Sequence, residues 1–319
     1  MKKLLAILLA AILCVGLMAG CGQTTIIVNM GGEDEAEETP AATEAPENTP
    51  EPAETAAPVV DDTPLPEGQL KTGLAIVSVV SSSSKAASAD ADGLAQADTT
   101  FAAVLVDGDG VIKDCLIDCV QTKIAVSATG EILTAADTAF DSKIVLDDAY
   151  DMRKASPIGA EWDEQANFLA DYVTGKTLDE VKGIAIDDGG KPTDADITTG
   201  CTMNIAEILT AVENAVANAK VLGAGVDDTL YMNCNAIVSS SSKAASADGD
   251  GNAQADVTVG AYTLDASGVI TSCYLDCVQA KIAVTAAGEI ASEVGTSYDS
   301  KLVLDDAYDM RKASPIGAE

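Results

Sequence analysis

The sequence predicts an α+β fold in which an antiparallel sheet is followed by packed helices. Short runs rich in Val, Ile and Leu come first in the folded part of the chain, and runs with helical spacing follow them. The whole pattern then begins again with a constant offset of 158 residues. Strands followed by helices are typical of α+β domains, so we expect one unit at residues 69–222 and a second, incomplete unit at residues 227–319.

The N-terminus has the layout of a secretory signal peptide. Lys2 and Lys3 precede an apolar run that ends in small residues directly before Cys21. The run is shorter than the roughly 20 apolar residues of a membrane-spanning helix. The string L-M-A-G-C resembles a lipobox, in which the Cys thiol receives a lipid. We therefore expect residues 1–20 to be removed and Cys21 to be lipidated; the alternative is an ordinary secreted protein cleaved at the Ala-Gly pair.

A segment rich in Pro and acidic residues follows. Residues 31–68 contain seven prolines and twelve acidic residues, and no Lys or Arg occurs between Lys3 and Lys71. Such a segment has too little apolar side chain to offset the entropy cost of ordering, and its like charges extend it. We expect residues 21–68 to be a disordered tether that holds a folded domain clear of the membrane.

The early part of the first unit predicts antiparallel strands. Residues 74–80, 100–106 and 111–126 are rich in Val, Ile and Leu. The string D-G-D-G at residues 107–110 separates the last two runs and is typical of a hairpin turn.

The later part of the first unit predicts mainly helices. Residues 162–173 are helix-like, and Thr177 with Glu180 forms a T-x-x-E capping box. Residues 183–187 are strand-like, and an amphipathic run then reaches Lys220.

The repeat stops before this helical part. Residues 146–161 recur without change as residues 304–319, and nothing corresponding to the first unit's helices follows. A unit without these helices would expose the apolar face that they cover. We therefore expect the sequence to be a fragment, with the second unit's own helices beyond Glu319; the alternative is a truncated gene.

The composition excludes several classes of chemistry. The chain has no His, so it cannot build a Ser-His-Asp triad, a Cys-His pair or a His-ligated zinc or haem site. Its net charge of −33 argues against nucleic acid and anionic lipid as direct partners. If the protein carries out chemistry, a bound cofactor is the expected agent.

Two other signals favour structural interpretations. The C-x-x-x-C pairs lie on strand-like runs, where four residues span about 13 Å, whereas a disulfide needs Cα atoms within about 7 Å. We expect buried, apolar thiols, with bridges to another strand as the second choice and a metal site last. The acidic turns at residues 90–93 and 248–251 lack the Glu of a calcium-binding EF-hand loop, so surface turns are expected. The Cys residues beyond Cys21 are Cys115, Cys119, Cys201, Cys234, Cys273 and Cys277.

The string D-I-T-T-G-C-T at residues 196–202 is the most informative motif. Apolar residues at helical spacing follow it from Ile205 to Val216. A hydroxyl residue is thus expected at a helix N-terminus, where free N–H groups and the helix dipole favour a phosphate group. The simpler interpretation is that Thr202 or Asn204 caps the helix, because Asn204 with Glu207 also matches a capping box.

The string resembles D-x-x-[ST]-G-A-T, the attachment motif of the FMN-binding domain in flavin-carrying subunits of sodium-pumping and related membrane oxidoreductases. In that family a flavin transferase joins the last Thr to FMN through a phosphoester. The resemblance implies that Thr202 is the acceptor, with Asp196, Thr199, Gly200 and Cys201 completing the motif; Cys201 stands where the family has Ala. Phrases at residues 118–123, 154–159, 172–181 and 192–196 look like the tandem-domain flavin lipoproteins of Gram-positive extracellular electron transfer.

This resemblance implies an electron carrier rather than a stand-alone enzyme, lipid-anchored at the outer face of the cytoplasmic membrane or the cell surface. FMN on Thr202 would pass electrons from a membrane quinol-linked donor to an extracellular acceptor, and the second unit would carry its own flavin. Two other classes remain open. One is a non-redox surface lipoprotein that binds a ligand or serves as an adhesin or spacer, and the other is a thiol-redox protein that uses the paired Cys.

Overall fold

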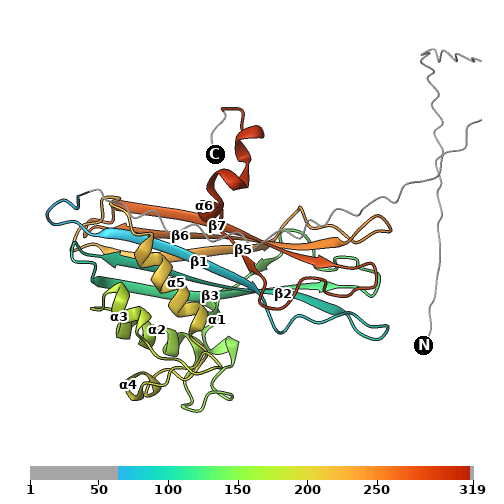
Figure 1. Cartoon of the computed structure of the whole chain (residues 1–319), viewed down its shortest axis with the longest axis horizontal. Helices are drawn as coiled ribbons and strands as arrows, with labels where there is room; N and C mark the ends of the chain where they lie inside the picture. Colours follow the sequence, from blue (N-terminus) through green and yellow to red (C-terminus); the bar gives the residue numbers. More distant parts are fainter. Residues whose placement is uncertain (1–63, 317–319) are drawn as a thin grey trace, which may run out of the picture. The chain divides into compact units, whose positions relative to one another are not determined.

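The computed structural model describes residues 64–316. They form two four-stranded antiparallel sheets, with strand orders β3-β2-β1-β8 and β4-β5-β6-β7, together with several helices (Figure 1). The predicted α+β class is confirmed. The predicted signal peptide, the lipidation site Cys21 and all but the last residues of the predicted tether lie outside the described residues.

The first sheet is built from the strands that the sequence predicts. It contains β1 (Lys71–Val80), β2 (Gly93–Val106) and β3 (Ile112–Val126); β1 and β2 are longer than the apolar runs that predicted them, and β3 begins one residue later than its run. The hairpin between β2 and β3 is present, and the Asp107 carboxylate accepts a hydrogen bond from the Val111 N–H at 3.0 Å. This side-chain acceptor favours the turn over continued strand.

The second sheet repeats these strands. Its members β5 (Thr229–Val238), β6 (Gly251–Leu264) and β7 (Ile270–Val284) have the same lengths as β1, β2 and β3, and their pairing registers correspond at the offset of 158 residues. The two sheets therefore offer the same strand frame with different side chains.

Each unit supplies an edge strand to the other unit's sheet. The two-residue β4 (Ala139–Phe140) pairs with β5, and β8 (Ser297–Tyr298) pairs with β1. Loops are also exchanged symmetrically, because Ala87 donates its N–H to the Gly288 carbonyl and Ala245 donates to the Gly130 carbonyl. Neither sheet is thus completed by its own unit alone.

The interior between the sheets is apolar. Two clusters of buried side chains each take members from both units, for example Phe101 with Val257 in one and Ile124 with Ile282 in the other. A buried hydrogen bond of 2.9 Å joins the Thr72 and Ser272 hydroxyls across this interior. Burial of apolar surface between the sheets is the main stabilising term for this part of the fold.

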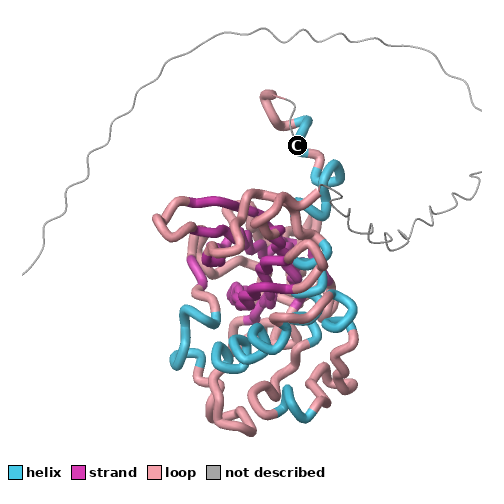
Figure 2. Tube along the Cα trace, turned by 90° about the vertical axis from the view of Figure 1, so that its left-hand side faces the viewer, coloured by secondary structure: helices cyan, strands magenta, loops and turns pink. Residues whose placement is uncertain are grey.

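Within residues 64–316, a layer of helices covers the opposite face of the first sheet. These helices are α2 (Trp162–Val173), α3 (Leu178–Lys182) and α5 (Ala206–Ala217), which Figure 1 labels, and Figure 2 shows a group of helices along one side of the strands. Their apolar faces form a third cluster with β2 and β3. The predicted helix at residues 162–173 and the Thr177–Glu180 capping box are both confirmed. The remaining short helices are α1 (Lys143–Leu146), α4 (Ala195–Thr198) and α6 (Lys301–Leu304), with 3-10 turns at Asp147–Tyr150, Asp305–Tyr308 and Met310–Lys312.

The outer face of the second sheet has no such cover among residues 64–316. Tyr231, Ile270 and Leu275 are 40%, 60% and 61% exposed there. The expected exposure of large apolar side chains on the second unit is therefore present in the part of the chain that is described.

The predicted strand at residues 183–187 is wrong. This segment is a loop with one isolated bridge, Ile186 opposite Pro192. The Asp187 carboxylate accepts from the N–H groups of Gly189 and Lys191, which closes a tight turn. The backbone bonds of the bridge, from the Asp187 N–H to the Lys191 carbonyl and from the Thr193 N–H to the Ala185 carbonyl, close this turn without extending into a ladder.

Candidate functional site

The motif at residues 196–202 begins in the short helix α4 and continues into a loop. The Asp194 carboxylate accepts from the Asp196 N–H at 2.8 Å and so caps α4. The Thr199 hydroxyl donates to the Asp196 carbonyl at 2.8 Å. Asp196 and Thr199 are both exposed, and this bond ties them together in one turn. Their observed contacts are local, which gives them a role in shaping the loop.

Thr202 is held by a residue that the sequence analysis missed. The side-chain oxygen of Gln165 in α2 accepts from the Thr202 N–H at 2.8 Å and from its hydroxyl at 3.4 Å. Gln165 is fully buried, and its amide group donates to the Ala160 carbonyl and the Ser156 hydroxyl. A buried amide with all its groups paired is rigid, so Gln165 fixes the position of Thr202.

The motif runs along α2 with about one contact per helical turn. A Cβ atom on Gly200 would lie 2.2 Å from the Phe168 ring, so only Gly permits this approach. One turn further on, burial raises the pKa of Tyr172, and the nearby charges of Asp194 and Asp196 raise it further. Gln165, Phe168 and Tyr172 therefore form the wall against which the motif lies. Their spacing of three and four residues puts them on one side of the helix.

Cys201 is an apolar filler. It is fully buried in the cluster between the first sheet and the helices. Burial raises the pKa of its thiol to about 11, against a smaller lowering by the backbone hydrogen bond of Met203. Such a thiol stays protonated and unreactive at neutral pH. A small apolar residue is what the position requires, so Cys suits it as Ala would.

Thr202 lies before the helix rather than at its start. Helix α5 begins at Ala206, and the Asn204 side chain accepts from the Ala206 N–H at 2.9 Å. The N-cap of α5 is Ile205, with no side-chain cap bond, so neither Thr202 nor an Asn204–Glu207 capping box caps this helix, and that interpretation is wrong. The expected seat of a phosphate on the helix N-terminus is displaced by several residues. Thr202 is half-buried between two buried neighbours, Cys201 and Met203, with its hydroxyl beside Gln165.

Glu161 is a second residue that sequence reasoning missed. Its carboxylate is almost fully buried and accepts from the N–H groups of Met152 and Arg153 at 2.7 and 3.1 Å. It also caps α2 in a reciprocal capping box with Glu164. Glu161 therefore fixes the loop before α2 against the start of the helix that carries Gln165.

The cysteines fall into two groups. All six described thiols are free; Cys115 and Cys119 are buried as predicted for the C-x-x-x-C pairs, and Cys201 is buried as well. The prediction of burial is wrong for Cys273, which is exposed, and only partly right for its pair member Cys277, which is half-buried; Cys234 is half-buried too. Among residues 64–316, the second sheet has no counterpart of the helices that cover Cys115 and Cys119. Burial raises the pKa of Cys119 to about 11 and that of Cys234 to about 12, which disfavours the reactive thiolates that thiol-redox chemistry needs.

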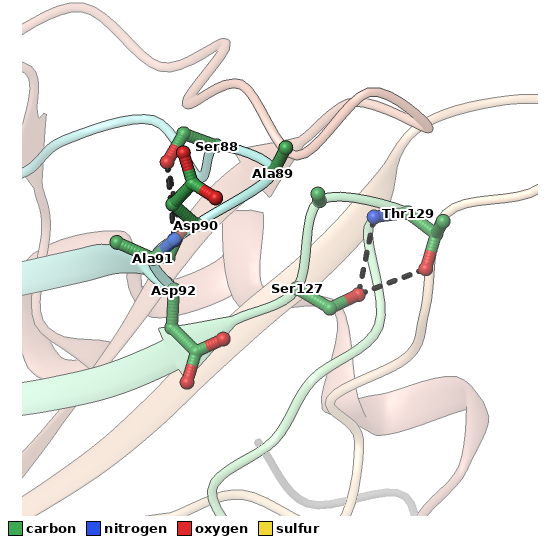
Figure 3. A pocket seen from close by; sticks show the side chains of 8 residues that line it. Ser88, Ala89, Asp90, Ala91, Asp92, Ser127 and Thr129 are labelled. Atoms are coloured by element: carbon green, nitrogen blue, oxygen red, sulfur yellow. Dashed lines mark hydrogen bonds between the residues drawn. The ribbon is translucent and has the colours of Figure 1, made fainter.

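The acidic turn at residues 90–93 borders a shallow hollow of about 470 Å³ (Figure 3). The Ser88 hydroxyl accepts from the Ala91 N–H, and the Ser127 hydroxyl accepts from the Thr129 N–H. These are local turn contacts. Among residues 64–316 no group of three or more Cys, Asp or Glu side chains is arranged to hold a metal ion.

Comparison with known proteins gave no match to a protein family, to a curated protein or to a solved structure. Within residues 64–316, no helix is both long enough and apolar enough to cross a membrane.

Proposed function

We propose that the protein is an extracytoplasmic electron carrier with FMN joined covalently to the Thr202 hydroxyl. The observation that carries the proposal is the fixed position of Thr202. Its N–H is held at 2.8 Å by a fully buried Gln165, while the residue itself is only half-buried between two buried neighbours. An acceptor for a modifying enzyme needs this combination of a defined place and an accessible oxygen.

The surrounding residues fit such a group. Gly200 allows the loop to lie directly against Phe168, and Cys201 fills the core beneath the motif. Phe168 and Tyr172 are partly buried aromatic side chains beside the loop. FMN would supply the redox chemistry, and the chain would supply attachment, partial burial and distance from other reactants. A covalent link suits a carrier outside the cell, because a dissociable cofactor would be lost by diffusion.

The proposed partners follow from this role. Maturation requires a flavin transferase, electrons come from a membrane quinol-linked donor, and the final acceptor is extracellular. The lipid on Cys21 would hold the protein at the outer membrane face or cell surface, and the tether would give it reach. With a net charge of −33, attachment to an anionic membrane depends on the lipid rather than on protein charge.

The test is co-expression with a flavin transferase, followed by mass spectrometry of the peptide that contains Thr202. We expect the mass of FMN, less one water, on Thr202 in the parent and in Cys201→Ala, and no added mass in Thr202→Val. An unmodified parent peptide, or equal flavin content in Thr202→Val, would remove the assignment and leave the non-redox surface lipoprotein as the better interpretation.

The role of Gln165 can be tested in the same system. Gln165→Met removes the acceptor for the Thr202 N–H with little change in volume, so the loop loses its fixed position. We expect at least about a tenfold slower flavin incorporation, which corresponds to the loss of about one hydrogen bond to a buried group. Incorporation at the parental rate, in a variant with unchanged far-UV circular dichroism, would show that Gln165 does not position the acceptor.

A further inference from the structure

A half-buried lysine lies in an aromatic box at the N-terminal end of α2, the helix whose Gln165 holds Thr202. The Lys143 ammonium at the start of α1 is 4.8 Å from the centre of the Tyr150 ring and 4.9 Å from that of Trp162. None of the ion pairs within residues 64–316 involves Lys143. Two ring faces thus stabilise a cation that has no carboxylate of the described residues in direct contact.

The box is joined to Thr202 through α2. Trp162 and Gln165 are three residues apart on this helix, so they are neighbours on its surface. Trp162 contacts Lys143, and Gln165 holds the Thr202 N–H. A cation and the proposed attachment oxygen are therefore positioned by consecutive turns of one helix.

The second unit contains part of the same box. Lys301 lies 4.7 Å from the centre of the Tyr308 ring, at the positions that correspond to Lys143 and Tyr150. Each lysine also has a Cys and an Asp at corresponding positions within electrostatic range. Trp162, Gln165 and Thr202 have no counterpart among the described residues of the second unit. Lys301 is therefore a matched cation without the neighbouring acceptor.

We propose, on the basis of the proposed function, that Lys143 is a positioning residue that stabilises the reduced state of FMN carried by Thr202. Reduction adds two electrons from the quinol-class donor and one proton from solvent, so the group gains one negative charge. Lys143 keeps its proton throughout and forms no bond. Its charge opposes the accumulated negative charge, which raises the midpoint potential relative to a protein without this cation.

The experiment is a spectroelectrochemical titration of fully flavinylated protein at pH 7. We expect Lys143→Met to lower the midpoint potential by about 30 mV or more, which is a tenfold change for a two-electron couple. Lys143→Arg and Lys301→Met should stay within about 10 mV of the parent. Lys143→Arg keeps the positive charge. Lys301→Met removes the corresponding cation of the second unit, which has no described flavin-attachment residue beside it.

Two controls separate the possible failures. Trp162 is the chain's single Trp, so its emission maximum in each flavin-free variant reports directly whether the box is still folded. Should Lys143→Met unfold it, Lys143→Gln takes its place with the same expected shift. A parental potential in a folded, fully flavinylated variant without the charge overturns the role of Lys143 and leaves the attachment intact. Absence of flavin from the parent protein instead overturns the proposed function on which the role depends.

Discussion

The outer faces of the two sheets differ although their strands correspond. In the first sheet, Gly73 and Ala75 lie beneath the helices, and the carbonyl of Ala215 in α5 contacts the position of the missing Gly73 side chain. The corresponding residues of the second sheet are Tyr231 and Asn233. The same strand frame thus supports a covered face in one unit and an exposed polar and aromatic face in the other.

The difference shows that the strands alone do not determine what can be packed on them. A Cβ at Gly73 would lie 2.0 Å from the Ala215 carbonyl oxygen, so a Tyr at this place excludes a helix seated as α5 is. In the second sheet, Tyr231 instead stacks on Tyr262 with ring centres 5.4 Å apart, and the Asn233 side chain donates to the Tyr262 hydroxyl. A helix on the second sheet would therefore have to pack differently from α5, and the expectation that the second unit carries its own flavin stays a prediction.

The largest effect on protein stability is expected from adding a methyl group to the outer face of each sheet. Gly73→Ala should destabilise the protein by about 3 kcal/mol, because the clash is with helix backbone that cannot rotate away. Gly260→Ala is the matched change on the second sheet, where the new Cβ meets only the end of the exposed Leu275 side chain. It should be neutral or stabilise by up to about 1 kcal/mol through lower unfolded-state entropy.

Urea unfolding followed by far-UV circular dichroism measures both glycine variants. Equal destabilisation would mean that the outer face of the second sheet is as tightly covered as the first, and the comparison would fail. Gly73→Ala without a stability loss would show that α5 can shift freely on β1.

The second expected difference between the units is in the alkylation rates of corresponding cysteines. Cys115 is buried beneath α2, and burial followed by the charge of Asp114 raises the pKa of its thiol well above the usual range. Cys273 occupies the corresponding strand position and is exposed. Brief alkylation of native protein should modify Cys273 at least about a hundredfold faster, because Cys115 reacts only after local opening.

Mass spectrometry of the two cysteine peptides after timed iodoacetamide exposure gives the alkylation ratio. Alkylation in denaturant, where both thiols are exposed, is the control and should give similar rates. Similar rates in the native protein would indicate that the helical layer opens often, which would also weaken the case for a fixed Thr202.

The sequence predicted the elements whose signal is local. The three strands of the first unit, the β2–β3 hairpin and the helix at residues 162–173 each follow from apolar spacing and turn residues within one segment. The exchanged strands β4 and β8 could not be predicted, because two residues carry no periodic pattern and their partners belong to the other unit.

The candidate site was predicted only in part for the same reason. The motif at residues 196–202 is visible in the sequence, but Gln165 is 37 residues from Thr202 and resembles any polar residue of a helix. The positions of α4 and α5 around the motif depend on their packing against α2. This packing joins distant segments, so no short sequence pattern reveals it. Cys273 was misjudged because its strand pattern equals that of Cys115, and only the absence of covering helices among the described residues distinguishes them.

The smallest expected effect is a change in the pH dependence of stability. It should be the same in both units, because the carboxyl groups responsible lie in the interior between the sheets. Asp118 and Asp276 occupy corresponding positions, and each accepts from the next residue's N–H at 2.7 Å. Burial raises the pKa of both carboxyl groups, and hydrogen bonds from Ser142 and Ser300 oppose the rise. A raised native pKa means that the folded state binds more protons than the unfolded state. Stability therefore falls as the pH rises from about 4 through the native pKa values.

Asp118→Asn and Asp276→Asn should each reduce this loss of stability between about pH 4 and pH 7, since an amide does not titrate and its oxygen can still accept the backbone N–H. Urea unfolding at several pH values measures the slope, and the change should be smaller than that of Gly73→Ala and similar for the two variants. If the slope of the unfolding free energy against pH falls in only one variant, the helices outside the first sheet affect the titration of carboxyl groups between the sheets. In that case, the difference between the units would not be confined to their outer faces.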